Sequence, residues 1–133
     1  MKRWIAAYVA GLVVFCAVDF AWLGLVMQDF YRAQLGALLL PAPKLLPGVL
    51  FYLLYMAGLV VFAVRPAISS ARAATPARLG ALFGLFCYAT YDLTNLATLQ
   101  GWSPLVTAVD IGWGMLLSAV VATSAWFAAR KFG

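Results

Sequence analysis

The amino-acid sequence predicts an all-α membrane protein, a bundle of four transmembrane helices that forms one transmembrane domain over residues 1–133. Of the 133 residues, 66% are hydrophobic and 10% are charged, and the mean hydropathy is +0.99. Soluble domains do not reach such values. Four apolar stretches, at about 4–27, 46–64, 78–99 and 104–128, are each close to the roughly 20 residues that a helix needs to cross the hydrocarbon core.

The distribution of basic residues predicts that both termini are cytoplasmic. In that topology seven of the nine Lys and Arg residues lie inside, and only Arg32 and Lys44 lie outside. Cytoplasmic loops carry the excess of Lys and Arg, which favours this orientation. The net charge of +5 is therefore a topological signal, and no nucleic-acid partner is expected. The seven inside residues are Lys2, Arg3, Arg65, Arg72, Arg78, Arg130 and Lys131.

The first apolar stretch is expected to stay in the protein as a spanning helix. Its start resembles a signal peptide, but the apolar run is too long for one and contains Asp19 and Trp22. The small residues of its inner half, such as Ala7 and Gly11, would let a neighbouring helix approach closely.

The connection from residue 28 to residue 45 is the only long one on the outside. Two interpretations of it stay open. It forms a short interfacial helix with Phe30, Tyr31 and Leu35 in the lipid headgroups, or it folds over the outer mouth of the bundle as a lid.

Capping residues mark where the last two helices begin. Thr75 is expected to be the N-cap of the third helix, with Pro76 at the first helical position. Ser103 and Pro104 repeat this pattern at the fourth helix. Pro47 similarly suits the first turn of the second helix.

Polar residues interrupt the third apolar stretch on one helical face. A G-x-x-x-G element for close helix packing, Gly80 to Gly84, precedes them on the side of Asp92. An ionisable carboxylate at membrane depth costs roughly 2.5–3.5 kcal/mol, so it should face the bundle interior and indicates a functional site. The polar residues, at positions i, i+3, i+4, i+7 and i+10, are Tyr88, Tyr91, Asp92, Asn95 and Thr98.

Three of the four acidic residues are expected at one depth. With a rise of about 1.5 Å per residue, Asp19, Asp92 and Asp110 lie roughly 9–11 Å below the outer end of their helices. Aromatic and amide side chains share this layer, as do Tyr52 and Tyr55 of the second helix. The predicted ligand-binding residues are Asp19, Trp22, Tyr88, Tyr91, Asp92, Asn95, Asp110 and Trp113.

Three buried acids without an intramembrane base would repel one another strongly if all were ionised. Three explanations stay open. Some of the three Asp side chains are protonated, or a basic residue of the outer loop, Arg32 or Lys44, folds down as a counter-ion. In the third, the site receives a cation. That cation would be a proton, a metal or an organic amine attracted by the Trp and Tyr faces. A purely structural role is the alternative: each Asp accepts hydrogen bonds from Trp, Tyr or Asn and holds the helices together.

Other chemistry has little support in the sequence. There is no histidine, and Cys16 and Cys87 are isolated residues suited to apolar packing, so no metal site is predicted. No glycine-rich phosphate loop, G-x-S-x-G or H-E-x-x-H motif occurs. The sequence assigns no catalytic residue and no cofactor.

Several signatures resemble a family of small bacterial inner-membrane proteins catalogued as a domain of unknown function. The resemblance covers nearly the whole chain. It implies a four-helix, multi-pass protein of the bacterial inner (plasma) membrane and supplies no activity or site residues. The signatures are Asp19-Phe-Ala-Trp22-Leu-Gly24, Phe30-Tyr31-Arg32, Gly80-Ala-Leu-Phe-Gly84, Tyr88-Ala-Thr-Tyr91-Asp92-Leu-Thr-Asn95-Leu-Ala-Thr98 and Asp110-Ile-Gly-Trp113-Gly114.

The sequence predicts an integral membrane protein with an acidic, aromatic-lined pocket in its outer half that binds a small cationic or lipid-like ligand. One alternative is a membrane enzyme that acts on lipid or isoprenoid substrates by Asp acid–base chemistry. Another is a small transporter, which would need a second copy of the chain to enclose a path, so a homo-oligomer stays open. A structural or accessory membrane subunit is the last alternative.

Overall fold

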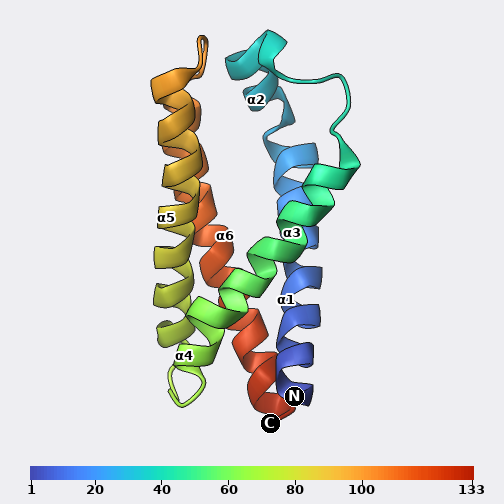
Figure 1. Cartoon of the computed structure of the whole chain (residues 1–133), viewed down its shortest axis with the longest axis vertical. Coiled ribbons are helices and arrows are strands. Elements are labelled where there is room, and N and C mark those ends of the chain that lie inside the picture. Colours follow the sequence, from blue (N-terminus) through green and yellow to red (C-terminus); the bar gives the residue numbers. More distant parts are fainter.

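A computed structural model describes all 133 residues and contains helices and no strand. Four long helical segments run along the molecule, and both termini lie at the same end (Figure 1). We call the opposite end the distal end. The elements are α1 (Lys2–Ala21) with the π-helical turn η1 (Trp22–Val26), α2 (Gln28–Leu35), η2 (Gly36–Leu38), α3 (Leu45–Leu59) with the π-helical turn η3 (Val60–Val64) and α4 (Arg65–Ala67), α5 (Ala74–Thr98) and α6 (Pro104–Lys131).

Three of these segments are long and apolar enough to cross a membrane. They are Lys2–Val26, Leu45–Ala67 and Pro104–Lys131, with mean hydropathies of 2.3, 2.2 and 1.8 in their most apolar windows. The predicted all-helical architecture is confirmed, and the chain has the apolar helices of a membrane protein. Helix α5 is of similar length but is not among the three, and it carries the polar residues between Tyr88 and Thr98.

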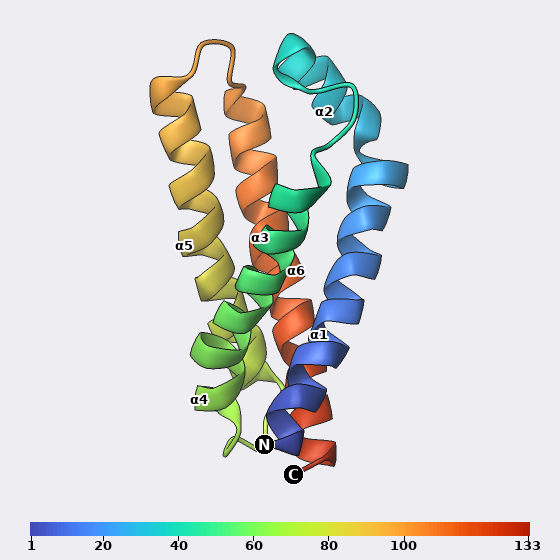
Figure 2. The ribbon, with the colours of Figure 1, turned by 45° about the vertical axis from the view of Figure 1, so that its right-hand side comes forward.

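Glycines bring α5 and α6 into direct backbone contact. The two helices run side by side in opposite directions, joined by a short distal connection (Figure 2). A Cβ atom added to Gly80 would lie 2.5 Å from the carbonyl oxygen of Ser118, and one added to Gly84 would overlap the carbonyl of Gly114. The close packing predicted for the Gly80–Gly84 element is therefore confirmed, and α6 is its partner.

The two predicted N-caps have different outcomes. Ser103 accepts a hydrogen bond from the backbone N–H of Val106 at 3.1 Å, with Pro104 at the first helical position, as expected. The prediction for Thr75 is wrong, because α5 begins at Ala74 and its N-cap residue makes no side-chain cap. The Thr75 hydroxyl is instead hydrogen-bonded to Ser70 of the preceding connection, at 2.7 Å.

Helix α2 folds back onto the distal end of the bundle. Leu35 is buried, and Ser103 at the start of α6 donates a hydrogen bond to Gln34 at 2.8 Å. Tyr31 also points inward and reaches α6. The expectation that Tyr31 and Leu35 lie in the lipid headgroups is therefore wrong, because both side chains contact other residues of the bundle. The structure favours the interpretation in which this segment is a lid.

Helix α3 crosses the bundle obliquely (Figure 1). Its first turns lie over α1, whereas η3, which follows it, packs beside α5. The side chains of Leu45, Leu46 and Leu54 are 72–80% exposed, which suits contact with lipid tails. The oblique course leaves the distal part of α3 away from α5, and the site described below lies there.

The glycine contact generates a test of the α5–α6 packing. Replacing Gly84 with Leu forces a side chain against the α6 backbone. We therefore expect the free energy of unfolding to fall by about 1–3 kcal/mol. Thermal unfolding of the purified variant in detergent measures this loss. The matched control is Gly112→Leu, because a Cβ atom there meets nothing within 4 Å. Equal stability of the two variants would contradict the packing account.

Candidate functional site

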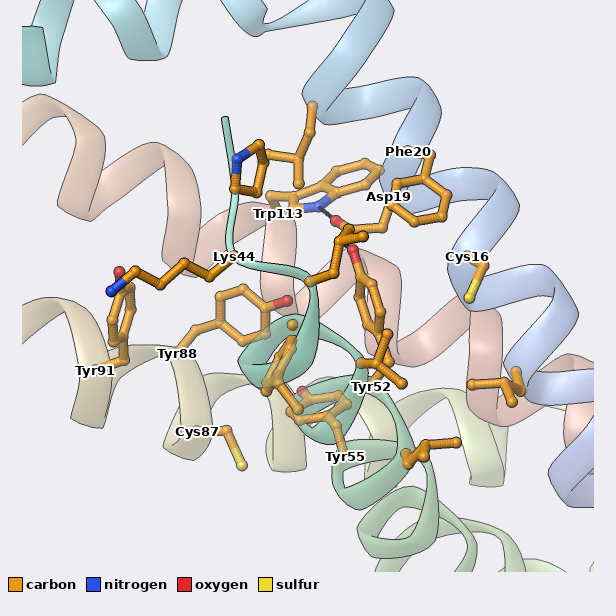
Figure 3. Close-up of a pocket in the computed structure, with 18 of the residues that line it drawn as sticks. Cys16, Asp19, Phe20, Lys44, Tyr52, Tyr55, Cys87, Tyr88, Tyr91 and Trp113 are labelled. Atoms are coloured by element: carbon orange, nitrogen blue, oxygen red, sulfur yellow. Dashed lines mark hydrogen bonds between the residues drawn. The ribbon is translucent and has the colours of Figure 1, made fainter. Parts of the chain in front are cut away.

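A cavity of about 920 Å³ opens in the distal half of the bundle, between α1, α3, α5 and α6. Of its 19 lining residues, 14 are hydrophobic. The hydroxyl groups of Tyr52 and Tyr88 and the indole of Trp113 are directed toward its interior (Figure 3). Ligand pockets in proteins have this size and this mixture, an apolar wall with a few polar groups.

Asp19 of α1 forms one acidic wall of the cavity. The residue is 6% exposed. Tyr52 of α3 donates a hydrogen bond to its Oδ2 at 2.6 Å, and the indole N–H of Trp113 on α6 donates to its Oδ1 at 3.2 Å. One carboxylate thus ties three helices together, as expected for a buried charge that is retained only with hydrogen-bond donors.

Two stacked tryptophans connect this wall to α2. The rings of Trp22 and Trp113 are parallel, with centroids 4.1 Å apart. Trp22 donates its indole N–H to the Tyr31 hydroxyl at 3.1 Å, and Tyr31 donates in turn to Asp110 Oδ1 at 3.0 Å. Burial raises the pKa of Tyr31, so its hydroxyl keeps the proton that it donates across the neutral pH range.

Asp92 of α5 has no such donors. It is completely buried, and neither carboxyl oxygen has a hydrogen-bond partner. No hydrogen bond links it to the carboxyl group of Asp110 on α6. Asp110 lines the cavity, whereas Asp92 does not. A buried carboxyl without a donor is costly, which marks this part of the bundle as a candidate site.

Lys44 is the one basic residue that lines the cavity. It is the N-cap residue of α3, and its side chain extends toward the Tyr91 hydroxyl (Figure 3). Of the two basic residues considered as counter-ions, Lys44 therefore reaches the site. Arg32 is exposed on α2 and does not line the cavity.

The structure places most of the predicted site residues around the cavity. Trp22 lies behind Trp113 and Asp92 behind Asp110, while Asn95 lies one turn beyond Tyr91 on α5 and does not line the cavity. The predicted residues that line the cavity are Asp19, Tyr88, Tyr91, Asp110 and Trp113.

Other lining residues were not predicted as part of the site. Tyr52 and Tyr55 were expected at the correct depth, which was the available signal. Cys16 and Cys87 were assigned to packing and are half-buried at the cavity wall. No group of three or more His, Cys, Asp or Glu side chains is arranged to hold a metal ion.

The hydrogen bond from Tyr31 to Asp110 predicts how α2 is held. Tyr31→Phe removes a hydrogen bond to a carboxyl group, and a typical intramolecular hydrogen bond is worth about 0.5–1.5 kcal/mol, so we expect the amides of α2 to exchange with solvent several-fold faster. Hydrogen-exchange mass spectrometry in detergent measures the change. Tyr8→Phe is the matched control, since Tyr8 donates to the backbone of Leu53 and is remote from α2. Unchanged exchange in α2 would show that Tyr31 does not hold it.

Comparison with known proteins gives a family match over nearly the whole chain. The sequence profile of the family described as "Predicted membrane protein (DUF2177)" matches residues 4–127. No curated protein and no solved structure matches the chain.

Proposed function

Since the chain belongs to the DUF2177 family of predicted membrane proteins, a description that names no activity, we infer its function from the site. We propose that the cavity binds a lipid-like ligand that carries a positively charged group. The observation that supports this most directly is the position of two carboxyl groups, Asp19 and Asp110, in a wall that is mostly apolar. Three further residues of the predicted site do not line the cavity and would support the lining side chains without touching the ligand: Trp22, Asp92 and Asn95.

The apolar wall supports the lipid-like part of the ligand. Side chains of α1 and α3, such as Leu12, Val49 and Phe51, face the cavity. Burying apolar ligand surface against them is favourable by roughly 25 cal/mol per Å². A cavity of about 920 Å³ has room for a substantial apolar portion together with a polar group.

The charge balance supports the cationic part. Asp19 and Asp110 line the cavity, and Lys44 is the only cation there. Buried carboxylates are costly unless a positive charge offsets them. The faces of Trp113 and the neighbouring tyrosines would add cation–π attraction for an ammonium group.

We also propose that α5 is the fourth span and that both termini are cytoplasmic. A chain whose termini lie at one end has to cross the membrane an even number of times, and the termini lie together (Figure 1). The basic residues at that end favour the cytoplasm. In a cysteine-free background, a membrane-impermeant maleimide should label Gln100→Cys in intact cells and Ala71→Cys only after permeabilisation. The reverse pattern would contradict this topology.

Filling the cavity tests the proposed function. Gly48 lines the cavity, and a Cβ atom there meets nothing within 4 Å, so Gly48→Phe should occupy the space without straining the fold. The probe is a long-chain primary alkylammonium that carries a diazirine, cross-linked to protein in nanodiscs. We expect the yield on cavity peptides to fall about tenfold, equivalent to about 1.4 kcal/mol.

Two comparisons make that result specific. Gly112→Phe is the matched control, because it adds the same side chain where there is open space outside the cavity. The corresponding neutral alkyl alcohol should give a low yield even with the unsubstituted chain, since it carries no positive charge for Asp19 and Asp110 to bind. Equal yields for Gly48→Phe and Gly112→Phe would refute the proposal.

A further inference from the structure

We propose that the ligand is a phospholipid whose head group combines a primary ammonium with a phosphate. The ammonium binds at Asp110 and the phosphate at Lys44. This inference rests on the proposed function and narrows it to one class of lipid. It is carried by the presence of the Asp110 carboxyl group and the Lys44 ammonium in the lining of one cavity.

Asp110 has one carboxyl oxygen free toward the cavity, and a primary ammonium supplies a donor for it. Tyr31 donates to Oδ1 of Asp110, no side chain donates to its Oδ2, and Asp110 lines the cavity. A primary ammonium offers three N–H donors together with a positive charge. A quaternary ammonium offers the charge alone, and a neutral glycerol head group offers donors without charge.

The anionic part of the head group matches the surroundings of Lys44, which also lines the cavity. Lys44 precedes the first turn of α3, a 15-residue helix that has no side-chain N-cap. The helix N-terminus and the lysine ammonium both favour an anion at this position. Tyr91 on α5, toward which Lys44 extends (Figure 3), adds a hydroxyl donor. A positive and a negative binding group thus line the same cavity.

The apolar surface beside the cavity accounts for the acyl chains. Leu45, Val49 and Leu53 line the cavity and are also 80%, 50% and 40% exposed. Side chains that face both the cavity and the exterior form an apolar path between them. A lipid could therefore place its head group inside while its chains follow α3 into the bilayer.

Native mass spectrometry with equal amounts of dioleoyl phosphatidylethanolamine, phosphatidylcholine and phosphatidylglycerol tests this inference. We expect the ethanolamine lipid to bind about tenfold more than either of the others. Asp110→Asn should remove that preference, and Asp92→Asn, which leaves the cavity wall unchanged, should lower it. Lys44→Ala should weaken binding of all three phospholipids. The controls are Asp29→Asn and Lys2→Ala, which change exposed charges outside the cavity.

The outcomes separate this inference from the proposed function. Equal binding of the three lipids, while the alkylammonium probe still labels the cavity, would overturn the head-group assignment alone. Loss of both signals would overturn the two together. Water-soluble glycerophosphoethanolamine is a further arm. If it bound as tightly as the whole lipid, the acyl chains would contribute nothing and the ligand would not be a membrane lipid.

Discussion

The placement of three carboxyl groups in an apolar bundle, with Asp19 and Asp92 buried and Asp110 half-buried, is the constraint on which the distal half of this protein depends. Asp19 satisfies it with donors from Tyr52 and Trp113, and Asp110 with a donor from Tyr31. These bonds determine where α2 and α3 can lie, because each partner belongs to a different element. Asp92 has only a second carboxyl beside it. The constraint is therefore met at two of the three positions by the protein itself.

The half of the bundle nearer the termini is built differently. There the helices pack through small residues and aliphatic side chains, including Ala7 of α1, Ala63 of η3 and Ala125 of α6, all fully buried. Gly80 lets α5 approach the α6 backbone in the same region. The dense packing provides a rigid base from which the helices diverge, and the cavity lies where α3 leaves α5. The most densely packed half of the bundle and the half in which we propose binding are thus opposite halves.

The sequence was sufficient for the helical architecture and for the depth of the site. Composition and apolar length predict the helices, and the glycine spacing predicts the tight α5–α6 contact. The positions of Asp19, Asp110 and Trp113 along their helices predict that the three residues lie at the same depth in the membrane. In the structure they line the same cavity. The azimuth of each helix is set by packing between distant segments, so the pairing of Asp19 with Tyr52 has no local signal.

Other features depended equally on tertiary contacts. The inward course of Tyr31 requires an acceptor on α6, 79 residues away in the chain, and the position of Lys44 follows from the oblique path of α3. For the same reason an amphipathic stretch such as α2 looks interfacial when considered by itself. The length of a helix can be predicted from its own stretch of sequence. The side chains that line a cavity depend on how distant segments pack together.

The central claim is that the distal cavity is completed by an amphiphile with its positive group at Asp110. A high-resolution structure of the protein purified with its native membrane lipids tests it most directly. The account predicts elongated density in the cavity, with one end within hydrogen-bonding distance of Asp110 and the other leaving along α3. A cavity closed by repacked side chains, with Asp110 hydrogen-bonded to protein groups alone, would contradict it.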